Sequence, residues 1–226
     1  MKKVIIFFIL AIFSFCLVFF SKTYLRKNGL LRFHDWNSVD DLMIVAHPDD
    51  ETLWGSEELL KNKYLVVCIT CGTNKKREKE IEAALKISKD RLIVLNKPDK
   101  VRGKRSNWKG YKKQIEYELK YIMKKKNWNT IVTHNPEGEY GHIHHKMTNK
   151  IVTKVYNQNQ NGKLKYFGKY FSKKRIHKNK GAREIPEDIY DMKMEMVDVY
   201  KSQAFIKNRF NQMYKYENLI NAEDWK

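Results

Sequence analysis

Leu42-Met43-Ile44-Val45-Ala46-His47-Pro48-Asp49-Asp50-Glu51 is the stretch of sequence that decides the fold. The apolar run up to Ala46 predicts a short buried strand, and a helical pattern follows from about residue 52. Three carboxylates crowded between them repel one another unless a cation or a proton offsets their charge. An imidazole and a carboxylate suit Zn²⁺, so His47 and Asp50 are candidate ligands and Asp49 is a candidate base. The alternative is a plain loop before an N-capped helix, since acids are common at helix starts.

Strand-like and helix-like segments alternate along the rest of the chain. Further strands are predicted at 64–70, 91–95, 130–133 and 165–171, and helices at 52–62, 75–88, 111–126, 143–157 and 188–207. This spacing is typical of βαβ units. We therefore expect an α/β fold with a Rossmann-like, mostly parallel sheet and helices on both faces.

The N-terminal segment from Val4 to Phe20 is almost entirely apolar. As a helix rising about 1.5 Å per residue it would span roughly 25 Å, enough for a bilayer core. No small-x-small cleavage site follows it, which favours an uncleaved anchor over a secretory signal. We expect a single-pass transmembrane helix in residues 1–21, a linker over 22–40 and one catalytic domain over 41–226. The positive-inside count leans toward a cytoplasmic catalytic domain.

The composition is strongly basic, with a net charge of +19 and a pI near 9.7 over 226 residues. Such a charge suggests an anionic partner: nucleic acid, an anionic membrane or a phosphorylated substrate. Aromatic residues do not interleave with the basic ones in the way that nucleic-acid binding favours, so no nucleic acid is expected. The loops at 97–110 and 163–183 are either solvated basic faces or borders of the site that attract an anionic substrate. The three cysteines form no disulfide framework, and Cys68 and Cys71 are either a redox pair or two buried thiols.

A second cluster follows the strand predicted at 130–133. It holds four histidines: His134, His142, His144 and His145. Because the carboxyl ends of parallel strands meet at one edge of a sheet, this cluster can meet His47 and Asp50. One more imidazole completes a His-Asp-His set that leaves a position for water, as in catalytic zinc sites. The alternative is a solvated helix start.

Ala46-His47-Pro48-Asp49-Asp50-Glu51, paired with Tyr140-Gly141-His142-x-x-His145, resembles the PIG-L/LmbE family of zinc-dependent de-N-acetylases. The resemblance continues in Ile69-Thr70-Cys71-Gly72 and in Tyr200-Lys201-Ser202-Gln203. It implies a Rossmann-like domain that binds one divalent cation, Zn²⁺.

The resemblance also implies roles for individual residues. The metal ligands would be His47, Asp50 and His145. Asp49 would be the general base acting on the zinc-bound water, and His142, aided by Tyr140, would stabilise the oxyanion or protonate the amine. Apart from the resemblance, Arg77 is a candidate for orienting the substrate; an ion pair with Glu78 or Glu80 on the helix surface is the alternative.

One position departs from the family. Bacterial members commonly carry Asp between the two histidines, and here His144 stands there. This leaves open a rival ligand set with His142 and His144.

The expected function is hydrolysis of a linear amide: removal of acetate from an N-acetylated amino sugar of the N-acetylglucosamine type, lipid- or phosphate-linked. One alternative is an amidase on another N-acyl substrate, such as a thiol conjugate or a peptide. Another is a non-catalytic basic homologue that binds membrane or nucleic acid, which the intact ligand set disfavours. The basic surface and the N-terminal helix would both contact the membrane.

Overall fold

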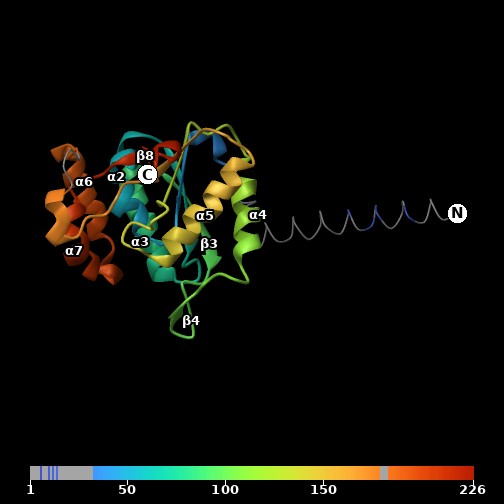
Figure 1. Cartoon of the computed structure of the whole chain (residues 1–226), viewed down its shortest axis with the longest axis horizontal. Helices are drawn as coiled ribbons and strands as arrows, with labels where there is room; N and C mark the ends of the chain where they lie inside the picture. Colours follow the sequence, from blue (N-terminus) through green and yellow to red (C-terminus); the bar gives the residue numbers. More distant parts are fainter. Residues whose placement is uncertain (1–5, 7–9, 11, 13, 15–32, 179–182) are drawn as a thin grey trace. The chain divides into compact units, whose positions relative to one another are not determined.

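The computed structural model describes residues 6, 10, 12, 14, 33–178 and 183–226, and Trp36–Lys226 form one compact unit (Figure 1). Its centre is a six-stranded sheet in the order β3-β2-β1-β6-β7-β8, parallel except for β8, which runs antiparallel to β7. This confirms the predicted α/β fold with a mostly parallel sheet. The strands are β1 (Asp41–Val45), β2 (Tyr64–Thr70), β3 (Arg91–Lys97), β6 (Thr130–Thr133), β7 (Lys163–Phe167) and β8 (Leu219–Asn221), and β4 (Lys100–Val101) pairs separately with β5 (Lys104–Arg105).

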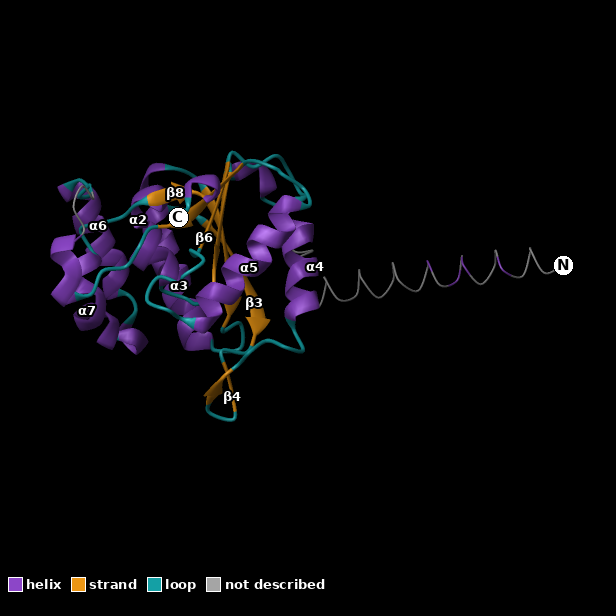
Figure 2. Ribbon diagram, viewed as in Figure 1, coloured by secondary structure: helices purple, strands orange, loops and turns teal. Residues whose placement is uncertain are grey.

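Helices cover both faces of the sheet (Figure 2). The pair α4 and α5 lies on one face, and α2, α3 and α6 pack together on the other. Every residue of β1 and β2 is buried, as expected for central strands of a covered parallel sheet, which is why they read as continuous apolar runs. The helices are α2 (Asp50–Lys61), α3 (Lys75–Ser88), α4 (Lys112–Met123), α5 (Ile143–Asn157), α6 (Glu187–Asp198) and α7 (Phe205–Phe210).

The chain reverses its direction of sheet growth at β1. From β1 it adds β2 and β3 on one side, and it then crosses over to place β6 on the other side. Ligands bind at such a switch point, outside the carboxyl ends of the strands. His47 follows β1 and His134 follows β6, so the two sequence clusters meet at this edge.

Helix α2 is kinked where Gly55 leaves helical geometry, with φ −142° and ψ 22°. A side chain at this position would collide with Met43 of β1, since an added Cβ would lie 2.7 Å from its terminal methyl carbon. The kink frees the backbone amides of Ser56 and Glu57, and both donate to the carboxylate of Glu217, at 3.1 and 2.8 Å. Lys193 of α6 pairs with the same buried carboxylate at 2.6 Å. Glu217 therefore fastens the helix that begins at Asp50 to α6.

Several predicted elements differ from the observed ones. The helix predicted over 188–207 ends at Asp198, because Tyr200 leaves helical geometry (ψ 58°) and donates its hydroxyl hydrogen to buried Glu51. The strand predicted at 165–171 is β7, at Lys163–Phe167. The short β4–β5 pair and the edge strand β8 were not predicted.

The predicted membrane location is wrong for the part of the chain that the structure describes. None of its helices there is both long enough and apolar enough to cross a bilayer. Most of the predicted anchor, and the linker up to residue 32, lie outside the described residues.

Replacing Glu217 by Ala tests the fastening of α2. The change removes the acceptor for two backbone amides and leaves Lys193 buried without its partner, so we expect a loss of about 3–5 kcal/mol in the free energy of unfolding. Urea denaturation measures this. The matched control is Glu116→Ala, which removes a surface pair with Lys154 and should cost about 0–1 kcal/mol. Equal losses in the two variants would contradict the role of Glu217.

Candidate metal centre

The carboxylate of Asp50, in the first turn of α2, lies among three imidazoles. Its Oδ2 is 3.2 Å from His47 Nδ1 and 3.3 Å from His134 Nε2, and its Oδ1 is 3.2 Å from His145 Nε2. Oδ2 also accepts the backbone N–H of His47 at 2.8 Å, which fixes the turn between β1 and α2. The structure thus brings the three predicted ligands together, and it adds His134, for which no role was predicted.

Glu139, which the sequence analysis missed, lies beneath these rings. Its carboxylate is hydrogen-bonded to Nδ1 of His145 and, at 3.0 Å, to Nδ1 of His134, and it accepts the N–H of Asn135 at 3.0 Å. Burial would raise the pKa of Glu139, but the two imidazoles lower it to about 2. The ionised carboxylate of Glu139 therefore accepts a hydrogen bond from the Nδ1–H group of each ring. The only signal in the sequence was an acid three residues before His142.

The remaining ring nitrogens carry lone pairs. Nε2 of His134 accepts the backbone N–H of Ala46 at 3.0 Å, so the proton of this ring is on Nδ1. Nε2 of His145 faces Asp50 and makes no hydrogen bond within the described residues. A carboxylate bound to one imidazole nitrogen, with the other nitrogen left unprotonated, is the usual arrangement behind a metal-ligating histidine.

The donor set fits a divalent cation better than it fits protons. Doubly protonated rings of His134 and His145 would repel each other, since their centroids are 3.9 Å apart in a stacked arrangement. A single cation among the lone pairs and the carboxylate of Asp50 balances the charge without this repulsion. Two groups of potential ligand atoms converge here within 4.8 Å of one another: His47 with His142 and His145, and Asp50 with His134 and His145.

Asp49 has a strained backbone, with φ 117°. Its N–H donates to the buried carboxylate of Glu51 at 3.0 Å, and Glu51 is itself held by the hydroxyls of Thr52 and Tyr200. Left-handed geometry at a non-glycine residue costs about 1–3 kcal/mol and persists only where its surroundings enforce it. Burial and the charge of Asp50 raise the pKa of Asp49 well above its ordinary value. The pKa therefore moves toward the range that suits a base at neutral pH.

Arg77 is buried against Asp49. Its Nη2 lies 3.1 Å from Oδ2 of Asp49 and also donates to the carbonyl oxygen of Pro48. The alternative ion pairs on the helix surface are not formed, because Glu78 pairs with Lys75 and Glu80 accepts hydrogen bonds from Ser202. Arg77 therefore orients Asp49, and it also borders the cavity described below.

His142 and Tyr140 lie on the other side of the centre. Nδ1 of His142 accepts the N–H of His144 at 3.3 Å, at the start of α5, so the ring proton is on Nε2. That Nε2 is buried and has no hydrogen-bond partner within the described residues. Burial and the rings of His47 and His145 lower the pKa of His142 to about 2. Its ring is therefore a neutral N–H donor, and burial also raises the pKa of Tyr140, whose phenol stays protonated.

His144 does not join His142 as a ligand pair. Its Nδ1 is 2.9 Å from Nε2 of His47, and its Nε2 is 2.7 Å from the carbonyl oxygen of Ser106. The partners of His144 are therefore His47 and the Ser106 carbonyl, whereas Nε2 of His145 lies 3.2 Å from Oδ1 of Asp50.

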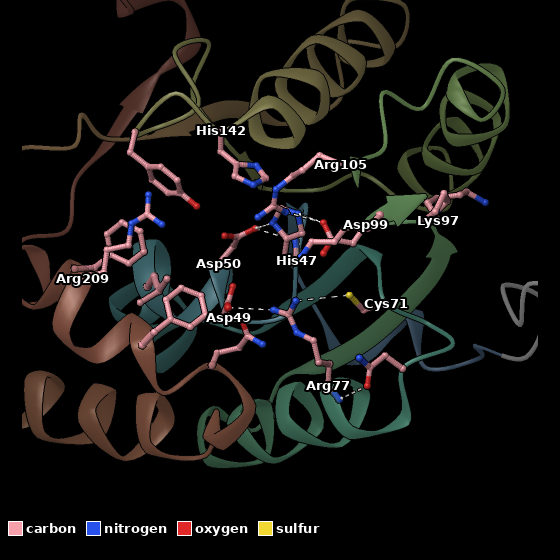
Figure 3. A pocket seen from close by; sticks show the side chains of 18 of the residues that line it. His47, Asp49, Asp50, Cys71, Arg77, Lys97, Asp99, Arg105, His142 and Arg209 are labelled. Atoms are coloured by element: carbon pink, nitrogen blue, oxygen red, sulfur yellow. Dashed lines mark hydrogen bonds and ion pairs between the residues drawn. The ribbon is translucent and has the colours of Figure 1, made fainter. Parts of the chain in front are cut away.

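The centre opens into a cavity of about 810 Å³ (Figure 3). The loop predicted at 97–110 does border it, through Pro98, Asp99, Lys100 and Arg105. The segment 163–183 does not: none of its described residues lines the cavity, so that prediction is wrong. The C-terminal region lines it instead, with residues that include Gln203 and Arg209. The guanidinium of Arg209 lies 5.0 Å from the ring centre of Tyr140.

A curated protein of Acanthamoeba polyphaga mimivirus, the uncharacterised protein L374, is similar to this chain. It is 33% identical over 131 residues, which cover 50% of this chain and 56% of the relative. The chain therefore spans little more than half the length of that relative. Among solved structures, GalB, the 4-carboxy-2-hydroxymuconate hydratase of Pseudomonas putida, is similar with a TM-score of 0.57. The sequences are 12% identical over 77% of this chain and 84% of that chain, a likeness of fold alone.

A family model described as PIG-L, GlcNAc-PI de-N-acetylase, matches residues 42–156. This match contains both sequence clusters and every imidazole that surrounds Asp50. On this evidence the chain belongs to the PIG-L family.

Proposed function

We propose that this protein hydrolyses the acetamide of an N-acetylated amino sugar, of the N-acetylglucosamine type and lipid- or phosphate-linked. The observation that carries this proposal is the convergence of two imidazole lone pairs and the Asp50 carboxylate beside a buried base, at the floor of a cavity. The family supports the reaction class.

The ion would be held by His47, Asp50 and His145. A bound Zn²⁺ supplies Lewis acidity there, polarising the amide carbonyl and lowering the pKa of water in its coordination sphere to roughly 7. His134 stacks on His145, and its Nε2 accepts the N–H of Ala46, so it offers no free lone pair to the ion. Glu139 keeps the protons of His134 and His145 on Nδ1.

Asp49 takes the proton of the attacking water. Its raised pKa makes it a stronger base than an ordinary aspartate, and Arg77 holds the carboxylate in one orientation. Asp49, whose backbone is strained, is among the residues that line the cavity (Figure 3). Because Asp49 is buried next to Asp50, its protonated form is not penalised by charge repulsion, and it can pass the proton on to the departing amine.

His142 stabilises the negative charge that develops on the acetyl oxygen. The neutral ring donates through Nε2–H, so it contributes a hydrogen bond rather than a full positive charge. Of the two roles predicted for His142, this protonation state supports oxyanion stabilisation. The protonated phenol of Tyr140, with its ring centre 5.7 Å from that of His142, is a second donor at the same wall.

The cavity lining supports a substrate that carries negative charge. Lys100, Arg105 and Arg209 all line it, and Arg209 has an exposed guanidinium above an aromatic face. Guanidinium groups match phosphate oxygens in a bidentate geometry. A phosphate-bearing N-acetyl sugar would place its acetamide at the metal centre and its phosphate beside these cationic side chains.

Acetate release tests the substrate class. We expect turnover of N-acetylglucosamine 1-phosphate to exceed that of the uncharged sugar. Arg209→Gln should raise KM for the phosphorylated sugar by about tenfold to a hundredfold and leave KM for the uncharged sugar unchanged. The control variant Lys201→Gln should leave both KM values unchanged. Activity on N-acyl thiol conjugates or peptides, without activity on either sugar, would replace the amino-sugar assignment by the amidase alternative.

Metal content tests the ligand set. The protein loaded with zinc and then desalted should hold one equivalent, and His145→Ala should lose it, since two remaining ligands do not hold zinc at a site of this kind. The matched control is His177→Ala, at an exposed histidine. Retention of zinc by His145→Ala would exclude this residue as a ligand.

Turnover of Asp49→Asn tests the base. Asn keeps the shape of the side chain but cannot take a proton, so we expect kcat to fall by about 10²–10⁴-fold while zinc content stays at one equivalent. Asp40→Asn, at a mostly exposed carboxylate, serves as the control. An unchanged kcat in Asp49→Asn would remove Asp49 from the reaction.

A further inference from the structure

His144 occupies a position that the metal centre itself does not explain. It is completely buried, and its ring stacks on that of Trp108 with centroids 4.4 Å apart and planes 8° from parallel. Both ring nitrogens are engaged, one by Ser106 and the other by His47. The residue at this position therefore acts on His47.

The hydrogen bonds define the tautomer of each ring. A carbonyl oxygen can only accept, so Nε2 of His144 donates to Ser106 at 2.7 Å. A neutral His144 then has a lone pair on Nδ1, and His47 must donate to it through Nε2–H at 2.9 Å. The carboxylate of Asp99 lies 3.5 Å from Nε2 of His47 and is a second acceptor for the proton on that nitrogen.

This assignment leaves the lone pair of a neutral His47 on Nδ1. That is the nitrogen 3.2 Å from Oδ2 of Asp50, on the side where His145 presents its own lone pair. The opposite tautomer would turn an N–H toward the ligand position and a lone pair toward that of His144. We propose that His144 is a positioning residue, which holds His47 in the tautomer and ring orientation that bind a metal ion through Nδ1. This inference rests on the metal centre of the proposed function, but not on its substrate.

The orientation of His144 comes from the loop that follows the β4–β5 pair. Trp108 donates its indole N–H to the carbonyl oxygen of Pro98 at 2.9 Å, and its backbone N–H to Oγ of Ser106 at 3.2 Å. The loop is closed further by the hydrogen bond from Ser106 N–H to Asp99, at 2.9 Å. The carbonyl of Ser106 is therefore fixed, and it fixes His144 in turn.

A second metal ion held by His47, His144 and Asp99 is the competing explanation, since these three also present ligand atoms within 4.8 Å of one another. Two nitrogens on one tetrahedral Zn²⁺ lie about 3.3 Å apart when each bond is about 2.0–2.1 Å. The observed 2.9 Å between the two imidazole nitrogens is instead a hydrogen-bond length. The geometry therefore favours a shared proton.

Two substitutions separate the two halves of this arrangement. In His144→Asn the amide oxygen lies near the former Nδ1 and keeps an acceptor for His47. In His144→Gln the amide lies near the former Nε2 and keeps the donor to Ser106, but the acceptor for His47 is lost. His177→Gln is the control at an exposed histidine.

The measurements use the full chain and zinc. Competition with a chromophoric chelator should show that His144→Gln weakens zinc binding by about tenfold to a hundredfold, the usual effect of losing a group that orients a ligand. His144→Asn should stay within about threefold of the unsubstituted protein. In ¹⁵N NMR of the unsubstituted, zinc-loaded protein, His47 should show a protonated Nε2 and a metal-bound Nδ1, whether or not the variants fold.

Three results would overturn the proposal: metal binding of His47 through Nε2, equal zinc affinity in the Asn and Gln variants, or a second zinc equivalent that is lost on replacing Asp99. Failure of the proposed function is a separate result. A protein with the expected zinc affinities and the expected His47 tautomer that releases no acetate from any amino sugar would retain the role of His144 and lose the substrate assignment.

Discussion

The buried carboxylate of Asp50 needs positive charge beside it, and the rest of the site is arranged around that need. Burial would raise the pKa of Asp50, yet the imidazoles of His145, His134 and His47 hold it well below its ordinary value. These rings can do so only by pointing protons at Asp50 or by sharing a cation with it. Glu139 accepts hydrogen bonds from the Nδ1–H groups of His134 and His145. A cation shared with Asp50 therefore balances its charge with less repulsion between the neighbouring rings than a second proton on each ring would cause.

Sheet topology brings these groups together, and a few buried polar contacts hold them in register. The switch point between β1 and β6 fixes the distance between the two clusters. Glu217 secures the kinked helix that carries Asp50, and Glu51, tied to Tyr200, maintains the strained backbone of Asp49. Glu217 and Tyr200 lie far in sequence from the groups that they hold, so the C-terminal region contributes to the site without supplying a ligand.

The cavity above the centre is lined by a loop that follows a sheet strand and by a C-terminal helix. Both supply guanidinium groups, Arg105 from the loop and Arg209 from α7. The same loop contacts His144 through the Ser106 carbonyl, so the element that borders the cavity also reaches the candidate metal centre.

The sequence by itself determined the α/β class, the order of most elements and the two clusters that meet at Asp50, because apolar periodicity and residue type are local properties of a chain. It did not reveal Glu139 as the partner of two imidazoles, the pairing of Arg77 with Asp49, or the end of α6 before Tyr200. Nor did it identify the partner of His144. Each of these depends on which buried polar group finds a partner across the sheet edge, and that choice is made by packing between residues distant in sequence. Only the tertiary structure could decide them, since a desolvated donor or acceptor takes the nearest complementary group, whichever segment supplies it.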